Sequence, residues 1–206
     1  PLVRQGYDLL AAAQTGTGKT AAFVLPMLQK IIEESTLYQK RVPRVLVLTP
    51  TRELAAQVGE TILSLGKDLG VRSAVVFGGV GINPQKAAIA KGLDFLVATP
   101  GRLLDLMNQG FADLSKTHIL ILDEADRMLD MGFLPDLKRI LKALPPDRQT
   151  LLFSATFSPE IKKLASEFLN KPESVEIERN KDSSLVRQTL YRVPKADKHT
   201  VLRDLI

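Results

Sequence analysis

The stretch that decides the fold is Ala13-Gln14-Thr15-Gly16-Thr17-Gly18-Lys19-Thr20. An apolar run, residues 8–12, leads into it, and a helix-like run, residues 21–32, leads out of it. A strand, a tight glycine-containing loop and a helix N-terminus together form the context of a phosphate-binding loop. All eight residues are therefore candidates for binding the phosphates of a nucleotide.

Each residue type in this loop has a physical role. Gly16 and Gly18 let the backbone turn tightly and approach a polyphosphate closely. Lys19 supplies a positive charge for the β- and γ-phosphates, and the Thr20 hydroxyl is a Mg²⁺ ligand. The usual pattern has glycine where this chain has Ala13, so a glycine-rich turn with an unrelated Lys-Thr pair stays open from this stretch alone.

The composition bounds the class of protein. The chain of 206 residues is 45% hydrophobic, which is enough for the core of one large domain, alone or with a fragment of another. It has no cysteine, which excludes disulfides, thiolate metal sites and cysteine nucleophiles, and which is compatible with the cytoplasmic location that we expect. No apolar run approaches the roughly 18 residues of a membrane span, so we expect no membrane partner.

The net charge of +5 is concentrated near the C-terminal end. Residues 179–206 hold 7 basic and 3 acidic residues, which leaves 21 basic and 20 acidic residues in the first 178. The body of the chain is therefore nearly neutral. Any nucleic-acid binding must come from local clusters of groups and not from a global basic field.

Short apolar runs alternate with amphipathic runs. The predicted strands are 8–12, 44–48, 73–77, 95–98, 118–122, 150–153 and 174–177, and the predicted helices include 21–32, 52–65, 133–144 and 159–169. Most strands are apolar throughout, which is typical of parallel strands buried on both faces. We expect Pro26 to kink the first helix. The pattern predicts an α/β fold, a three-layer P-loop domain with a mainly parallel sheet covered by helices on both faces.

Carboxylates follow the strand 118–122, in Asp123-Glu124-Ala125-Asp126. Ligands of such a sheet bind at the carboxyl ends of its strands. Asp123 can hold Mg²⁺, and Glu124 can orient and deprotonate an attacking water. Acidic residues stabilising a helix N-terminus are the alternative, which the phosphate loop upstream makes less favoured.

Three other strand ends carry small groups or hydrogen-bond donors, in the segments 50–55, 78–79 and 99–102. We expect Thr51 to cap a helix, and Arg52 and Arg102 to face outward toward phosphates. Because the three segments contain no aromatic residue, they predict a track for a sugar-phosphate backbone that is largely independent of sequence. Ser154-Ala155-Thr156, after the strand 150–153, is either a small polar turn or a sensor of nucleotide state that hydrogen-bonds to Asp126.

With these motifs in place, the sequence resembles the DEAD-box ATP-dependent RNA helicases over nearly its whole length. Six motifs stand in the family's order, at 13–20, 50–55, 78–79, 99–102, 123–126 and 154–156. The resemblance also explains Ala13, because alanine is the family's usual residue there. The segments 77–80, 83–85 and 127–133 look most like the bacterial RhlE-type branch.

The resemblance implies the N-terminal RecA-like lobe of a two-lobed enzyme that binds ATP and Mg²⁺ between its lobes and separates short RNA duplexes. It implies catalytic roles for Lys19, Asp123 and Glu124, with Thr20 and Asp123 as metal ligands. Asp126, Ser154 and Thr156 would couple ATP to RNA. The implied RNA contacts are Pro50, Thr51, Arg52, Gly79, Thr99, Gly101 and Arg102.

By the same resemblance, residues 1–178 would form this lobe, 179–185 a linker, and 186–206 the beginning of the second lobe, with a strand at 186–193 and a helix from Lys195. The chain opens with Pro1, so we expect the natural N-terminus, the family's adenine-reading glutamine motif and the rest of the second lobe to lie outside it. The tail would then have no core of its own, and we expect it to lie against the lobe or to pair with a neighbouring molecule.

Three functions remain open at this point. The chain could belong to an ATP-dependent RNA helicase, to a scaffold that binds RNA or a partner without catalysis, or to a DNA helicase or another P-loop ATPase. Intact Lys19, Asp123 and Glu124 favour an enzyme over a scaffold. The combination of 123–126 with 154–156 favours the RNA family, by resemblance.

Overall fold

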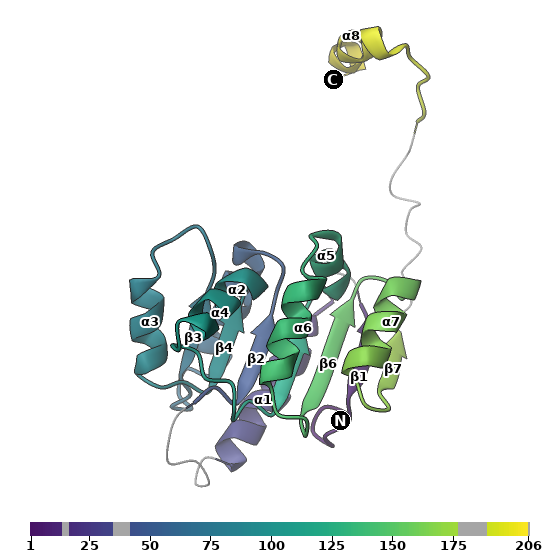
Figure 1. Cartoon of the computed structure of the whole chain (residues 1–206). Coiled ribbons are helices and arrows are strands. Elements are labelled where there is room, and N and C mark those ends of the chain that lie inside the picture. Colours follow the sequence, from purple (N-terminus) through teal and green to yellow (C-terminus); the bar gives the residue numbers. More distant parts are fainter. Residues whose placement is uncertain (14–16, 35–41, 177–188, 206) are drawn as a thin grey trace.

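Seven strands pair in parallel into one sheet with the order β3-β4-β2-β5-β6-β1-β7 (Figure 1). The structure is a computed structural model that describes residues 1–13, 17–34, 42–176 and 189–205. The strands are β1 (Leu9–Ala12), β2 (Val45–Leu48), β3 (Ser73–Val76), β4 (Phe95–Ala98), β5 (Ile119–Leu122), β6 (Gln149–Ser154) and β7 (Glu173–Glu176). Each of the seven strands predicted between residues 8 and 177 is present within one residue at each described end, which confirms the parallel α/β fold.

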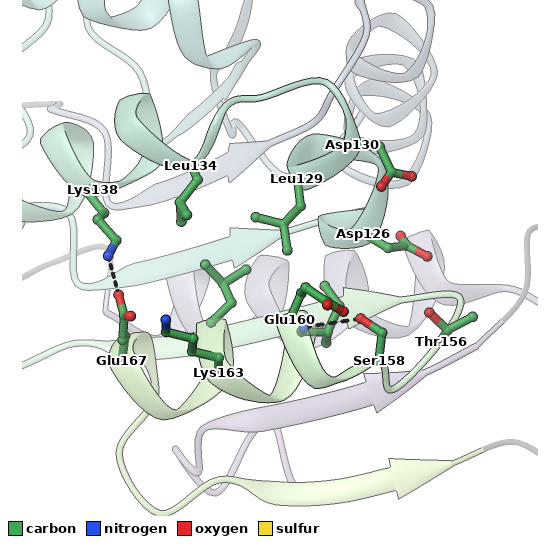
Figure 2. Close-up of a pocket in the computed structure, with 12 residues that line it drawn as sticks. Asp126, Leu129, Asp130, Leu134, Lys138, Thr156, Ser158, Glu160, Lys163 and Glu167 are labelled. Atoms are coloured by element: carbon green, nitrogen blue, oxygen red, sulfur yellow. Dashed lines mark hydrogen bonds and ion pairs between the residues drawn. The ribbon is translucent and has the colours of Figure 1, made fainter.

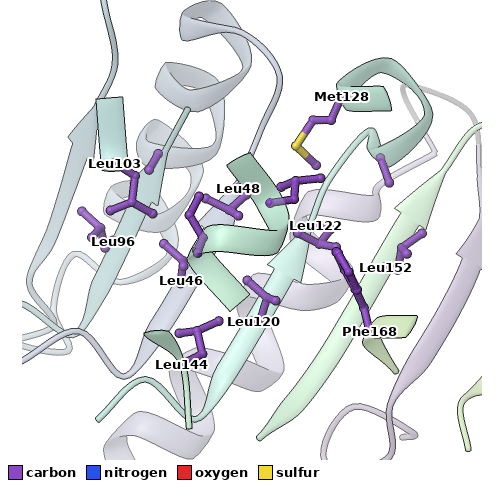
Figure 3. Close-up of a cluster of buried hydrophobic side chains, with 14 of the residues drawn as sticks. Leu46, Leu48, Leu96, Leu103, Leu120, Leu122, Met128, Leu144, Leu152 and Phe168 are labelled. Carbon is purple, nitrogen blue, oxygen red and sulfur yellow. The ribbon is translucent and has the colours of Figure 1, made fainter. Parts of the chain in front are cut away.

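The central strands are apolar throughout because they are buried from both sides. Side chains alternate between the two faces of a strand. Val45 and Val47 of β2 therefore pack into one cluster, together with helices α1 (Lys19–Glu33) and α2 (Arg52–Leu65). Leu46 and Leu48 pack into the opposite cluster, together with α4 (Pro100–Asn108), α5 (Ala125–Asp130), α6 (Leu134–Ala143) and α7 (Pro159–Phe168) (Figure 3).

The four helices predicted with bounds are present, and the shorter helices α3, α4 and α5 had no predicted bounds. The runs predicted at 21–32, 52–65, 133–144 and 159–169 correspond to α1, α2, α6 and α7, and α1 continues through Pro26. The sequence did not predict α3 (Asn83–Ala90). Within α3, all of whose residues are described, only the polar Gln85 is buried, so no apolar stripe marks the helix.

A buried carboxylate fixes the amino end of β1. Asp8 accepts a hydrogen bond from the Thr150 N–H at 2.7 Å and another from the Asn170 N–H at 2.6 Å. Thr150 lies near the start of β6, and Asn170 lies in the connection between α7 and β7. Asp8 thus ties β1, which leads into the phosphate loop, to β6, which ends at Ser154, and to the connection before β7.

The C-terminal tail only partly follows the prediction. The helix expected from Lys195 is present as η3 (Lys195–Asp197) and α8 (Lys198–Leu205), drawn apart from the sheet in Figure 1. The predicted strand over 186–193 is wrong for residues 189–193, which have no regular structure, and 186–188 lie outside the described residues. Also outside the described residues are Ile177, Ile206 and the linker predicted at 179–185. Leu190 is 84% exposed, and Leu202 and Leu205 are about half exposed, so these side chains have no core around them. The assignment of residues 186–206 to a second lobe stays a prediction.

Candidate active site and nucleic-acid interface

The phosphate loop links β1 to α1 at the carboxyl edge of the sheet. Gly18 is the N-cap of α1 with φ 83°, a left-handed conformation that favours glycine. No side chain of the described residues caps this helix end, and its first turn has no acidic residue. The first-turn N–H groups, with Lys19 and Thr20 at the start of the helix, therefore suit an anion. The candidate residues Gln14, Thr15 and Gly16 lie outside the described residues.

Lys19 and Asp123 face each other across this edge. Lys19 Nζ lies 3.8 Å from Asp123 Oδ1, and the two side chains are only 9% and 7% exposed. Burial raises the pKa of the Asp123 carboxyl, and the charge of Lys19 opposes that shift. A bound cation would also favour the ionised carboxylate. The geometry thus places one buried carboxylate next to the lysine of the phosphate loop.

Glu124 holds its carboxylate beside this pair in an unusual backbone conformation. Its φ is 53° and its ψ 52°, a left-handed conformation that costs a side-chain-bearing residue about 1–3 kcal/mol. The Glu124 N–H donates to Asp123 Oδ1 at 3.1 Å. Arg127 Nη1 donates to Glu124 Oε2 at 3.3 Å, so a residue of α5 orients the carboxylate. This sharp turn places the two neighbouring carboxylates at the end of β5.

Two hydrogen bonds, each donated by a main-chain N–H, connect the phosphate loop with the Asp123–Asp126 turn through the segment 154–155. The Ala13 N–H donates to the Ser154 carbonyl at 3.0 Å, and the Ala155 N–H donates to Asp126 Oδ2 at 3.1 Å. The predicted contact between 154–156 and Asp126 is therefore present, but the backbone of Ala155 makes it. Ser154 Oγ instead accepts from the Thr156 N–H at 3.3 Å, which stabilises the turn itself.

The proposed nucleic-acid contacts come together because β3, β4 and β2 are neighbours in the sheet. Thr51 caps α2 as predicted, accepting from the Leu54 N–H at 3.3 Å. Arg52 is 62% exposed and pairs with Glu53 at 2.6 Å. Gly79 has φ 81°, and a Cβ atom placed on it would lie 3.9 Å from Arg52 Nη1. The loop after β3 and the start of α2 therefore form one continuous surface.

Arg102 does not point outward, contrary to the prediction. Its side chain is only 12% exposed, and its Nη2 donates to the Val80 carbonyl at 3.1 Å. Its Nε also lies 3.8 Å from Asp105 Oδ2. Helix α4, which begins at Pro100, thus directs Arg102 against the loop after β3, close to Gly79. Thr99 is the N-cap of α4, and Gly101 lies exposed in its first turn.

A model of the DEAD/DEAH box helicase family matches residues 1–164. The chain belongs to this family. Its relatives include the chloroplastic DEAD-box ATP-dependent RNA helicase 3B of Zea mays, 45% identical over 98% of this chain and 28% of the relative. They also include the ATP-dependent RNA helicase CshA of Limosilactobacillus reuteri, 44% identical over all of this chain and 41% of the relative. The chain thus spans less than half the length of these curated relatives.

Solved structures of the family have the same fold. A DEAD box protein from Methanococcus jannaschii is similar to this chain with a TM-score of 0.77 and 36% identity, over 100% of this chain and 54% of that one. A hypothetical ATP-dependent RNA helicase from Sulfolobus tokodaii gives a TM-score of 0.77 and 41% identity, over 86% of this chain and 50% of that one. The RecA-like fold predicted from the sequence is therefore confirmed. The assignment to the RhlE-type branch stays a prediction.

Sequence reasoning missed two residues of this DEAD-box domain that hold others in place. Arg127 orients Glu124, and a charged residue three positions after a carboxylate on a helix is the signal that could have found it. Gln85 is buried and bonds to the loop that contains Gly79. A buried glutamine has no periodic signature in a sequence, so its segment, 83–85, indicates only the resemblance to the RhlE-type branch.

A cavity of about 710 Å³ lies between α5, α6 and α7 (Figure 2). Asp126 and Thr156 line one end of it, and the ion pair between Lys138 and Glu167, at 2.7 Å, lies at the other. None of the four residues implied for ATP and Mg²⁺ lines it. The cavity therefore borders Asp126 and Thr156 and does not include the residues implied for ATP and Mg²⁺.

The described residues contain neither a cluster of metal-binding side chains nor a helix that could cross a membrane. The part of the chain that the structure describes has no group of three or more His, Cys, Asp or Glu side chains that could hold a metal. Mg²⁺ bound to nucleotides commonly needs only one or two protein ligands, because phosphates and waters complete its shell. Among the described helices, none has the length and apolarity that crossing a membrane requires.

Proposed function

We propose that the chain is the nucleotide-binding lobe of an ATP-dependent RNA helicase, whose RNA-stimulated ATP hydrolysis drives the local separation of RNA duplexes. The observation that carries the proposal is the pairing of Lys19 with Asp123 at the carboxyl edge, next to Glu124. A scaffold without catalysis has no need for a buried lysine and carboxylate at this place. Membership of the DEAD/DEAH box helicase family supports the same conclusion.

The residues present fit ATP and Mg²⁺. Ala13, Gln14, Thr15, Gly16, Thr17 and Gly18 would form the phosphate loop. Thr20 and Asp123 would hold the metal ion, which supplies charge neutralisation at the β- and γ-phosphates. Lys19 would leave its partner Asp123 to contact these phosphates, and Glu124, oriented by Arg127, would accept the proton of the attacking water.

RNA would lie across the ends of β2, β3 and β4. Arg52 is the exposed cation of this surface and would contact a phosphate directly. Thr51, Gly79, Thr99 and Gly101 would allow close approach of the RNA backbone. Pro50, the other predicted contact, is buried and would act only by shaping the chain before α2. Arg102 would hold the loop after β3 in place through its hydrogen bond to the Val80 carbonyl, or would break that hydrogen bond and contact RNA itself. Asp126, Ser154 and Thr156 would couple the ATP site to the RNA surface. The hydrogen bonds from Ala13 to Ser154 and from Ala155 to Asp126 connect these residues with the phosphate loop.

The proposal extends to the second lobe, the location and the self-association of the whole protein. A second RecA-like lobe would complete the ATP site and the RNA surface. The cytoplasmic location and the self-association of the chain through its exposed tail also stay predictions.

The test is an ATPase assay of the full-length protein with single-stranded RNA, duplex RNA or DNA of the same sequence. We expect RNA to raise the rate strongly and DNA to have little effect. Equal stimulation by DNA would favour a DNA helicase. Hydrolysis that no nucleic acid stimulates would favour another P-loop ATPase, and no hydrolysis at all would favour a scaffold.

A further inference from the structure

Gln85 is a buried polar side chain that none of the roles above uses. It is 8% exposed, on a helix with no other buried residue. Its Oε1 accepts from the Phe77 N–H at 3.2 Å, and its Nε2 donates to the Phe77 carbonyl at 3.1 Å. The Nε2 also lies within hydrogen-bond distance, 3.4 Å, of the Gly81 carbonyl. One side-chain amide thus contacts both ends of the loop 77–81.

The position of Phe77 explains why this contact sets the direction of the loop. β3 is the outermost strand of the described sheet, next to β4 alone. The Val76 carbonyl points toward β4, where it accepts from the Thr99 N–H at 3.1 Å. Since neighbouring peptide groups of a strand point to opposite sides, the N–H and C=O of Phe77 face away from β4. Gln85 pairs with both of them as a neighbouring strand would.

The loop between the two contacts carries the surface proposed for RNA. Gly79 lies against Arg52, and the Val80 carbonyl accepts from Arg102 Nη2. The other terminal nitrogen of Arg102, Nη1, is buried and has no hydrogen-bond partner among the described residues. Apart from its ion pair with Asp105, Arg102 is held by its hydrogen bond to Val80, and Val80 lies between the two ends that Gln85 holds.

We propose that Gln85 is a positioning residue for RNA binding, which fixes the loop 77–81 so that Gly79, Arg52 and Arg102 keep their relative places. The inference rests on the proposed function of the lobe. It deepens that function by assigning the shape of the RNA surface to a residue that would not itself touch RNA. The loop lies at the outer strand of the sheet, so nucleotide binding at the end of β1 should not depend on Gln85.

The test uses Gln85→Glu and Gln85→Met in the full-length protein, with RNA-stimulated ATPase as the readout. The carboxylate of Gln85→Glu can still accept from Phe77 but cannot donate to the two carbonyls, whereas its protonated form regains a donor. Methionine has a similar length and restores no donor at any pH. We expect both variants at pH 8 to need about tenfold more RNA for half-maximal rate, the loss typical of an unpaired buried group. The KM for ATP and the kcat at saturating RNA should stay within about twofold.

The pH dependence separates positioning from a general loss of stability. We expect the defect of Gln85→Glu, measured relative to the wild type at each pH, to shrink between pH 8 and pH 6, while that of Gln85→Met stays constant. Gln57→Glu, which adds the same charge at an exposed place on α2, is the matched control and should need no more RNA than the wild type.

Two results would overturn the inference while leaving the proposed function intact. One is RNA dependence equal to the wild type in both variants. The other is a fall in kcat, or a rise in the KM for ATP, that matches the change for RNA, because this would indicate damage to the whole lobe. A wild-type protein that RNA does not stimulate would overturn the proposed function, and this inference with it.

Discussion

Glu124 combines a strained backbone with a carboxylate next to the candidate metal ligand, Asp123. We predict that Glu124→Gln in the full-length protein still binds ATP and RNA but hydrolyses ATP about 10²–10⁴-fold more slowly, the usual cost of losing a general base. The amide keeps the shape of the side chain and can still contact Arg127, so binding should survive. Single-turnover hydrolysis and RNA binding by fluorescence anisotropy check both parts. Hydrolysis near the wild-type rate would remove the role given to Glu124.

Arg52 is partly neutralised by its neighbour Glu53, at 2.6 Å. The hydrogen bond and charge of Glu53 raise the pKa of Arg52, so the guanidinium is charged at any pH used for binding. We predict that Glu53→Gln tightens RNA binding by about 2–5-fold, because an exposed ion pair of this kind is weak and competes only modestly with a phosphate for Arg52.

The control for this prediction is Glu60→Gln, which removes the same charge from an exposed place further along α2. It should tighten RNA binding less than Glu53→Gln does, since Glu60 lies about two turns away from Arg52. Equal effects of the two variants would mean that only the net charge matters. Weaker binding by Glu53→Gln would contradict a phosphate contact by Arg52.

At the scale of single residues, the sequence predicted which residues lie at the site better than where their side chains point. The patterns around Lys19 and Asp123 were enough to expect both residues at the same edge of the sheet, since both follow strands of one parallel sheet. The sequence could not show that Arg102 turns inward, because that depends on an acceptor, the Val80 carbonyl, from a different strand end. Nor could it show that the backbone of Ala155, and not a side chain, contacts Asp126.

Among the elements, β1 carries the phosphate loop and depends on Asp8 for its attachment. We predict that Asp8→Ala lowers the free energy of unfolding by about 3 kcal/mol, since two hydrogen bonds to a charged group are lost and two backbone N–H groups are left unpaired. Urea denaturation followed by circular dichroism measures this. Asp147→Ala, at an exposed site, is the control and should change stability little. A loss below about 1 kcal/mol for Asp8→Ala would mean that other contacts hold β1.

Elements with a strong apolar pattern were predictable, and those that depend on polar contacts or on a partner were not. Strands such as β2 and β5 are buried on both faces and read as unbroken apolar runs. α3 has Gln85 as its one buried residue and has no apolar stripe. The predicted strand at 186–193 has the right composition, but a strand needs a neighbour to pair with, and residues 189–193 have none among the described strands.

For the whole molecule, the exposed tail has a consequence for stability. We predict that ending the chain after Arg179 leaves its melting temperature nearly unchanged, because the described residues 189–205 are exposed or half-exposed. The same truncation should reduce any self-association, since Leu190, Tyr191 and Leu202 are apolar groups open to a neighbouring molecule. Differential scanning calorimetry and sedimentation velocity check the two statements. A drop in melting temperature of several degrees would show that the tail stabilises the lobe.

The central claim is that one lobe carries a nucleotide site and an RNA surface that are coupled to each other. The most direct measurement is the affinity of the full-length protein for single-stranded RNA, by fluorescence anisotropy, with Mg²⁺ and either a non-hydrolysable ATP analogue or ADP. We predict that RNA binds at least about fivefold more tightly with the analogue, and that RNA tightens binding of the analogue by the same factor, as linkage requires. RNA affinity that is the same with the analogue and with ADP would contradict the coupling.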